Sequence, residues 1–189
     1  MGAQDSKLFV ISGPSGAGKG TLVTRVRERR SNLGLTVSAT TRAPRKGEVD
    51  GVNYFFLTRE EFDRRVANGE FVEWAEVHGN CYGTLVSEVT SKLASGSSLI
   101  LEIDVQGALQ VKERFPEAVL IFIKPPSLEV LRERLDGRGT ETPETIELRM
   151  ANAAHELALA DRYDDVVVND DLDRATDELV RVLDMHERI

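Results

Sequence analysis

The stretch that decides the fold runs from Lys7 to Lys19 and reads KLFVIS followed by GPSGAGK. Its first six residues are mostly apolar and predict a short buried β-strand, and a helical pattern from Thr21 to Arg30 follows the glycines. A G-x-x-x-x-G-K segment between a strand and a helix is typical of a polyphosphate-binding loop. Its glycines let several backbone N–H groups approach one anion, and the start of the helix adds about half a positive charge.

The whole loop is therefore a candidate site for a nucleoside triphosphate. Lys19 can bridge the two terminal phosphates. Gly20 takes the place of the hydroxyl residue that commonly assists magnesium, so Thr21 becomes the nearest hydroxyl. The alternative is a glycine-rich surface turn that binds nothing. The candidate residues are Gly13, Pro14, Ser15, Gly16, Ala17, Gly18, Lys19, Gly20 and Thr21.

Strand and helix patterns alternate along the rest of the chain. Apolar strands separated by helices predict βαβ units, and hence an α/β fold of the P-loop NTPase type, with a parallel sheet covered by helices on both faces. The strand patterns are Leu35–Ala39, Tyr54–Phe56, Phe71–Val77, Ser98–Asp104, Val119–Lys124 and Asp165–Val168. The helical patterns are Arg59–Ala67, Ser87–Ala94, Gln106–Arg114, Leu128–Leu135, Glu144–Ala160 and Leu172–Glu187.

Two segments interrupt this alternation. Between residues 34 and 84 the strands are short and turn signals are frequent, which predicts a small mixed α/β lobe inserted into the core. A polar segment from Gly137 to about Ala160 predicts a second insertion. We therefore divide the chain into a core (1–33, 85–125 and 164–189), a lobe (34–84) and a helical lid region (126–163).

The composition excludes several classes of protein. The chain has 189 residues, of which 41% are hydrophobic, and this fraction is too high for a disordered protein. No apolar run reaches the ~20 residues of a membrane span, and the N-terminus lacks a secretory signal, so we expect a cytoplasmic protein with no membrane partner. The single cysteine, Cys81, allows no internal disulfide, and we find no zinc-ligand spacing.

The charge distribution favours a small polyanion as the ligand. The net charge of −8 argues against a nucleic-acid binder, because such binding depends on a basic surface. Residues 25–46 nevertheless carry seven basic side chains and one acidic side chain. Within this segment, Pro44 stiffens the backbone between Arg42 and Arg45, so two guanidinium groups can grip one phosphate. The alternative is a solvated basic surface.

Glu73 is the candidate for base recognition. Strand alternation places Phe71, Glu73, Ala75 and Val77 on one face, so this carboxylate interrupts an apolar row and needs a donor partner. Guanine offers adjacent donors at N1 and the 2-amino group, whereas adenine offers an acceptor at N1, so a buried carboxylate there would select guanine. The alternative is an ion-paired glutamate on an edge strand.

Further candidates follow the later strands. Asp104 follows an apolar strand and can hold a magnesium-bound water or a substrate hydroxyl, or else cap the next helix. Tyr82 and Thr84 share a face and, like Tyr54, can contact a phosphate or a base, although buried aromatics are more often part of a core. Arginines near Gly137 can bring positive charge over a transferring phosphoryl group, or else form a solvated helix face. They are Arg134, Arg138 and Arg149.

Together these motifs resemble those of guanylate kinases. In chain order they are GPSGAGKGT from Gly13, TTRAPRKGEVDGVNYFF from Thr40, FVEWA from Phe71, NCYGT from Asn80, EIDVQG from Glu102, GRGTET from Gly137 and VNDDL from Val168. The second and sixth motifs are the most specific, and the resemblance extends from about Leu8 to Val182. There are departures: Thr84 stands where some members have serine, Cys81 replaces an aromatic residue, and Glu102 stands where some members have aspartate.

The resemblance implies a core, a GMP-binding lobe and a lid, and an enzyme that transfers a phosphoryl group from ATP to GMP, and to dGMP, with magnesium. It implies direct in-line transfer, because the acceptor is already an anion and requires no base. The implied guanine contacts are Ser38, Glu73 and Thr84. The implied GMP phosphate contacts are Arg42, Arg45, Tyr54 and Tyr82, and Glu48 and Asp104 line the same site. On the ATP side, Lys19 would bind the phosphates, Asn169 and Asp170 would lie near the adenine, and Arg134, Arg138 and Arg149 would close over the transfer, with Arg42 also counted as catalytic.

Two alternatives remain open at this point. A non-catalytic module of the same family would bind protein partners through the lobe, but such modules typically lose loop or arginine residues, and this chain keeps Lys19, Arg42 and Arg138. A related kinase could act on AMP or a sugar phosphate, which Glu73 together with Ser38 disfavours. The sequence leaves both a monomer and a dimer open.

Overall fold

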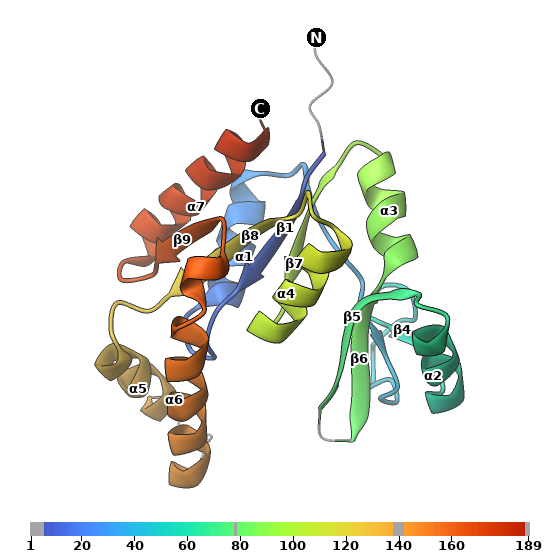
Figure 1. Cartoon of the computed structure of the whole chain (residues 1–189), viewed down its shortest axis with the longest axis horizontal. Coiled ribbons are helices and arrows are strands. Elements are labelled where there is room, and N and C mark those ends of the chain that lie inside the picture. Colours follow the sequence, from blue (N-terminus) through green and yellow to red (C-terminus); the bar gives the residue numbers. More distant parts are fainter. Residues whose placement is uncertain (1–5, 78, 138–141, 188–189) are drawn as a thin grey trace.

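The central sheet is built around the strand that precedes the glycine loop. The computed structural model describes residues 6–77, 79–137 and 142–187. Five parallel strands in the order β2-β7-β1-β8-β9 form this sheet (Figure 1). They are β1 (Leu8–Ser12), β2 (Leu33–Leu35), β7 (Ser98–Glu102), β8 (Val119–Lys124) and β9 (Asp165–Val168). The predicted α/β fold with a parallel sheet is confirmed.

Helices cover both faces of this sheet because its strands are apolar on both sides. Phe9 and Ile11 of β1 pack with residues of α1 (Lys19–Arg29) and α7 (Leu172–Glu187). Leu8 and Val10 of the same strand pack on the other face with residues of α3 (Val86–Ala94) and α4 (Val105–Arg114). Successive side chains of a strand point to opposite faces, so one short strand contributes to two cores. Figure 1 shows α7 and α4 on opposite sides of the central strands.

A second sheet forms the lobe that the turn signals predict. It has four strands in the order β4-β3-β6-β5, namely β3 (Ala39–Thr40), β4 (Phe55–Phe56), β5 (Phe71–Val77) and β6 (Asn80–Leu85). One face is covered by α2 (Arg59–Ala67), whose Phe62 is fully buried and stacks on Phe71 with ring centroids 4.4 Å apart. Cys81 lies buried in the same apolar cluster, where it packs as a small hydrophobic residue.

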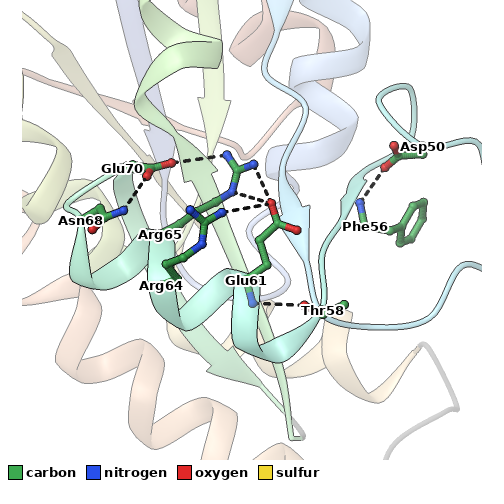
Figure 2. Close-up of polar contacts among 8 residues, drawn as sticks. All are labelled: Asp50, Phe56, Thr58, Glu61, Arg64, Arg65, Asn68 and Glu70. Carbon is green, nitrogen blue, oxygen red and sulfur yellow. Dashed lines mark hydrogen bonds and ion pairs between the residues drawn. The ribbon is translucent and has the colours of Figure 1, made fainter.

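Polar contacts fix both ends of α2 (Figure 2). The hydroxyl of Thr58 accepts a hydrogen bond of 3.1 Å from the backbone N–H of Glu61, which satisfies a donor of the first turn. Glu61 also pairs with Arg65 at 2.8 Å, and Arg65 reaches Glu70 beyond the helix at 3.4 Å. Asn68 donates to the same Glu70. These contacts tie the helix to the turn that leads into β5.

The lid region contains two packed helices, α5 (Leu128–Asp136) and α6 (Pro143–Leu157), followed by a 3-10 turn at Ala160–Arg162. Leu131 and Leu135 of α5 pack against Ile146 and Ala153 of α6 in a small apolar cluster. Among the described residues, no helix has the length and apolar character needed to cross a membrane. Arg138 lies outside the described residues.

The strand predicted at Leu35–Ala39 is wrong. The chain instead completes β2 at Leu35, where it pairs with β7 of the core sheet, and starts β3 at Ala39, where it pairs with β6 of the second sheet. Val37 lies between the sheets, and its N–H donates to the carboxylate of Glu88 at 2.8 Å. A single apolar run of the sequence therefore contributes residues to a strand in each of the two sheets. The strand β6 was not predicted, because it contains a glycine and few apolar residues.

Candidate active site

Two glycines of the loop lie so close to neighbouring residues that no side chain fits at either position. Gly13 has φ 144°, and a Cβ atom added there would lie 2.2 Å from the carbonyl oxygen of Ile123 in β8. Gly18 has φ 90°, and a Cβ atom added there would lie 2.3 Å from Nδ2 of Asn169. Both positions require glycine for conformation and for space. The loop therefore keeps its backbone N–H groups close to any anion that it encloses.

Lys19 places its charge over this loop. Its Nζ donates to the carbonyl oxygen of Gly13 at 2.5 Å and to that of Pro14 at 3.1 Å. The carboxylate of Glu102, at the end of β7, lies beside Gly20, since a Cβ atom added to Gly20 would be 3.6 Å from it. Burial raises the pKa of Glu102, and the Lys19 charge opposes that shift. The sequence analysis assigned no role to Glu102, although its position at a strand end was the available signal.

A pocket of about 260 Å³ opens next to the loop. Arg134 donates from Nη2 to the carbonyl oxygen of Asn169 at 2.8 Å, and the amide of Asn169 donates to the carbonyl oxygen of Ala17 at the same distance. Asp170 pairs with Arg174, and the backbone N–H of Asp171 lowers the pKa of Asp170. The structure thus brings Arg134, Asn169 and Asp170 together beside the loop. The pocket is lined by Gly16, Gly18, Thr21, Arg134, Asn169, Asp170 and Leu172.

The lid helix α6 contacts the same loop. Arg149 donates from Nη1 to the hydroxyl of Ser15. The positive charge of the Arg149 side chain therefore reaches the loop from α6.

A β-bulge decides which way Glu73 points. In the ladder between β5 and β6, Phe71 is opposite Leu85 but Glu73 is opposite Thr84, so β5 carries one extra residue here. Phe71 and Trp74 consequently both contact Phe62 of α2, and the ring centroids of Trp74 and Phe62 are 6.2 Å apart. The predicted common face of Phe71 and Glu73 is therefore wrong.

The Glu73 carboxylate lies in a mostly buried position with one protein donor on Oε1. The hydroxyl of Thr84, which is fully buried, donates to Oε1 at 2.8 Å. Burial raises the pKa of Glu73, and the nearby charge of Asp104 raises it further, whereas the Thr84 hydrogen bond lowers it. A Cβ atom added to Gly107 in the first turn of α4 would lie 3.5 Å from Oε2. The arrangement is suited to a ligand that donates two hydrogen bonds.

An arginine and two tyrosines lie on the same face of the second sheet. Tyr82 is opposite Ala75 in the ladder, two positions from the pair of Glu73 and Thr84. The rings of Tyr54 and Tyr82 are 6.2 Å apart, and the Arg42 guanidinium lies 5.4 Å from the Tyr54 ring centroid. Tyr82 also forms a side-chain hydrogen bond with Arg42. Two tyrosine side chains and a guanidinium therefore lie together, and these are groups that can donate to a phosphate.

Glu48 orients this arginine. Its two carboxylate oxygens accept from Nη2 and Nη1 of Arg42 at 2.9 and 3.1 Å, and it also accepts from the backbone N–H of Arg45 at 2.7 Å. These hydrogen bonds lower the pKa of Glu48. The Arg45 side chain is exposed, and Ser38 is half-buried immediately before β3. Arg42 is thus held in place, while Arg45 is only anchored through its backbone.

Asp104 joins the two halves of the site. It caps α4 by accepting from the backbone N–H of Gly107 at 2.7 Å, as the alternative interpretation expected, and its charge also acts on Glu73. A pocket of about 290 Å³ between α4 and α6 is lined by Asp104 and by Glu156. Burial raises the pKa of Glu156, while the Lys19 charge lowers it. Glu156 therefore lies within electrostatic reach of both Lys19 and Asp104, and no pattern in the sequence predicted this position.

Among the residues that the structure describes, no cluster of three or more His, Cys, Asp or Glu side chains is arranged to hold a metal ion.

The comparisons with known proteins agree with this geometry. The family model for guanylate kinase matches residues 5–186. A guanylate kinase of Gloeobacter violaceus is 57% identical over 94% of this chain and 87% of its own length, and one of Halalkalibacterium halodurans is 51% identical over 97% and 90%. The crystal structure of guanylate kinase from Anaplasma phagocytophilum matches with a TM-score of 0.73 and 36% identity, over 97% of this chain and 87% of that chain. The chain therefore belongs to the guanylate kinase family.

Proposed function

We propose that this protein transfers the γ-phosphoryl group of ATP to GMP or dGMP, giving ADP and GDP or dGDP, and that it does so in the cytoplasm. Family membership supports the reaction. One observation carries the assignment of the site: the Glu73 carboxylate lies against the first turn of α4, beside Asp104. Since α4 follows β7, and β7 lies next to β1 in a parallel sheet, the base-recognising strand meets the core at the edge where the loop begins.

The loop and Lys19 hold the triphosphate. Backbone N–H groups of residues 15–19 surround the phosphates, and the Lys19 ammonium group, which donates to the carbonyl oxygens of Gly13 and Pro14, turns to the terminal phosphates. Asn169 and Asp170 border the pocket that accepts the adenosine end. Arg134, Arg138 and Arg149 close over the transferring group, where positive charge is worth orders of magnitude in rate.

The lobe selects and orients the acceptor. Glu73 accepts from N1–H and the 2-amino group of guanine, and Ser38 and Thr84 complete the contacts with the base. Arg42, held by Glu48, grips the phosphate together with Arg45, Tyr54 and Tyr82. The acceptor phosphate is already an anion, so positioning, neutralisation of charge and exclusion of water are sufficient for in-line transfer.

Magnesium fits the residues present beside the loop. The Thr21 hydroxyl and the Glu102 carboxylate are hard oxygen donors, and they would hold the ion or its waters together with the phosphates of the nucleotide. When bound, the ion would neutralise charge on the phosphates.

A panel of acceptors tests this function. The purified chain is incubated with ATP, magnesium and one of GMP, dGMP, AMP or CMP, and ADP formation is measured. We expect turnover with GMP and dGMP at least about 100-fold faster than with AMP or CMP, because a mismatched base leaves buried polar groups unpaired. The matched control is Lys19→Met, which should fold and lose about 1,000-fold or more in turnover. Equal use of AMP, or an active Lys19→Met variant, would contradict the assignment, and no turnover with any acceptor would favour a non-catalytic binding module.

A further inference from the structure

An arginine of the core occupies the open edge of the second sheet. β5 is the outer strand of that sheet, so one row of its carbonyl groups has no neighbouring strand. Arg114, the last residue of α4, donates to the carbonyl oxygen of Phe71 at 3.0 Å and also to that of Gly69. The guanidinium therefore holds both carbonyls at the point where the strand begins.

A guanidinium is suited to this double contact. Nη1 bonds to Phe71 and Nη2 bonds to Gly69, and these two nitrogens are fixed in one plane. Gly69 has φ 68°, and a Cβ atom added there would lie 4.0 Å from both nitrogens. The turn at Gly69 therefore leaves room for the Arg114 guanidinium, and this planar group fixes the relative positions of the two carbonyl groups.

The held carbonyls border the bulge that orients Glu73. The extra residue of β5 lies between Phe71 and Glu73. Because side chains alternate along a strand, a change of one residue in register moves every later side chain to the other face. Fixing the Phe71 carbonyl therefore fixes the first residue of the bulge, and with it the direction of the Glu73 carboxylate.

The helix α4 contacts β5 at both of its ends. Its first turn approaches Glu73 at Gly107, and its last residue is Arg114. A pocket of about 430 Å³ between α4 and β5 is lined by both Glu73 and Arg114. A core helix therefore sets the distance between the core sheet and the strand that carries Glu73.

We propose that Arg114 is a positioning residue for guanine selection, which keeps Glu73 aimed at the base by clamping the carbonyls of Gly69 and Phe71. The proposal rests on the function proposed above, because it gives Glu73 the role of reading guanine. Arg114 acts through Glu73 and contacts neither nucleotide.

The test measures acceptor selection in Arg114→Met and Arg114→Lys, with IMP as the probe because its base lacks the 2-amino donor of guanine. For Arg114→Met we expect KM for GMP to rise about tenfold, the ratio of kcat/KM for GMP over IMP to fall about tenfold, and KM for ATP to stay within about twofold. Arg114→Lys should lie between this variant and wild type, because an ammonium group lacks the planar fork.

The matched control is Arg64→Met on α2 of the same lobe. This exposed arginine lies 3.7 Å from Glu61, and its replacement should leave KM for GMP, the GMP to IMP ratio and KM for ATP unchanged.

A double-mutant cycle with Glu73→Gln separates positioning from a structural role. If Arg114 acts through Glu73, adding Arg114→Met to Glu73→Gln should change the GMP to IMP ratio by less than about twofold. A lower melting temperature with unchanged KM for GMP and an unchanged ratio would overturn the proposal. The proposal would also be overturned if Arg114→Met lowered the GMP to IMP ratio by the same factor in the Glu73→Gln background as in wild type. If Arg114→Met does not fold, Arg114→Lys decides the question through the same ratio. Wild-type protein that does not use GMP would instead remove the proposed function, and the Arg114 proposal with it.

Discussion

The hydroxyl of Thr84 donates a hydrogen bond of 2.8 Å to Oε1 of Glu73. Thr84 lies directly opposite Glu73 in the ladder between β6 and β5, and it is fully buried. A carboxylate has about four acceptor sites, so the hydroxyl and the backbone N–H of Thr84 together leave about two of them for a ligand. The pair combines a buried negative charge with an incomplete set of donors, and such a site favours a base that supplies two donors itself.

Removing the Thr84 hydroxyl should weaken GMP binding. In Thr84→Val the volume is nearly kept, but Glu73 loses its side-chain donor and keeps only the backbone N–H of residue 84, so the carboxylate is oriented less well and its pKa rises further. We expect KM for GMP to increase about tenfold, which corresponds to about 1.4 kcal/mol, in steady-state kinetics at saturating ATP. Thr84→Ser keeps the hydroxyl and serves as the control. Equal KM values in wild type and Thr84→Val would show that the hydrogen bond has no part in base recognition.

The raised pKa of Glu73 predicts a pH dependence. Only the ionised carboxylate accepts two hydrogen bonds from guanine, and burial moves its protonation to a higher pH than that of an ordinary glutamate. As the pH falls through this raised pKa, kcat/KM for GMP should decrease, and kcat/KM should recover when the pH is brought above the pKa again. The phosphate of GMP also titrates near pH 6. The control is therefore Glu73→Gln, whose profile should lose the Glu73 component and keep that of the phosphate; superimposable profiles would contradict the prediction.

Gly18→Ala should damage the loop through two separate effects. The residue has φ 90°, and its new methyl group would collide with Nδ2 of Asn169 at 2.3 Å. We expect a loss of about 2 kcal/mol in unfolding free energy and a rise of at least about tenfold in KM for ATP. Gly96→Ala is the matched control, because Gly96 has φ 84° with open space around it. That variant should lose about 1 kcal/mol from backbone strain alone and keep normal kinetics. A Gly18→Ala variant no worse than Gly96→Ala in either measurement would refute the close approach.

The ion pair between Arg30 and Glu187 should stabilise the fold without affecting catalysis. Arg30 directly follows α1 and Glu187 is the last residue of α7, and their side chains are only 11% and 2% exposed. Glu187→Gln leaves a mostly buried guanidinium with Asp184 alone, so we expect a loss of about 3 kcal/mol in thermal or urea unfolding and an unchanged kcat.

A matched control for Glu187→Gln lies on the same helix. Asp177 pairs with Arg29 across the same two helices, but both side chains are about half exposed, at 58% and 43%. Asp177→Asn should therefore cost less than about 1 kcal/mol. Equal losses in the two variants would show that burial does not distinguish these pairs.

The loop could be predicted from the sequence because its determinants are local. Each of its glycines, together with Lys19, lies within seven consecutive residues, and β1 and α1 flank them directly. The alternation of strands and helices likewise predicts a parallel sheet with both faces covered. The sequence could not predict how the run beginning at Leu35 is divided, because that depends on partners in β7 and β6 that are far away in the chain.

The orientation of Glu73 was the harder problem. Simple alternation placed Glu73 with Phe71 and Ala75, and the structure keeps it away from the Phe71 side because a bulge intervenes. A bulge arises from the pairing of two strands, and β6 had not been recognised as a strand. The contact of Arg114 with the carbonyls of Gly69 and Phe71 is also non-local, and an arginine at the end of a helical pattern resembles any other solvated residue.

Selection of the acceptor base depends on one carboxylate, that of Glu73. The decisive measurement is kcat/KM for GMP in Glu73→Gln at saturating ATP, compared with wild type. We expect a decrease of about 100-fold or more, because an amide presents a donor to the donor edge of guanine, together with an unchanged KM for ATP. Unchanged GMP kinetics in a folded Glu73→Gln protein would contradict it.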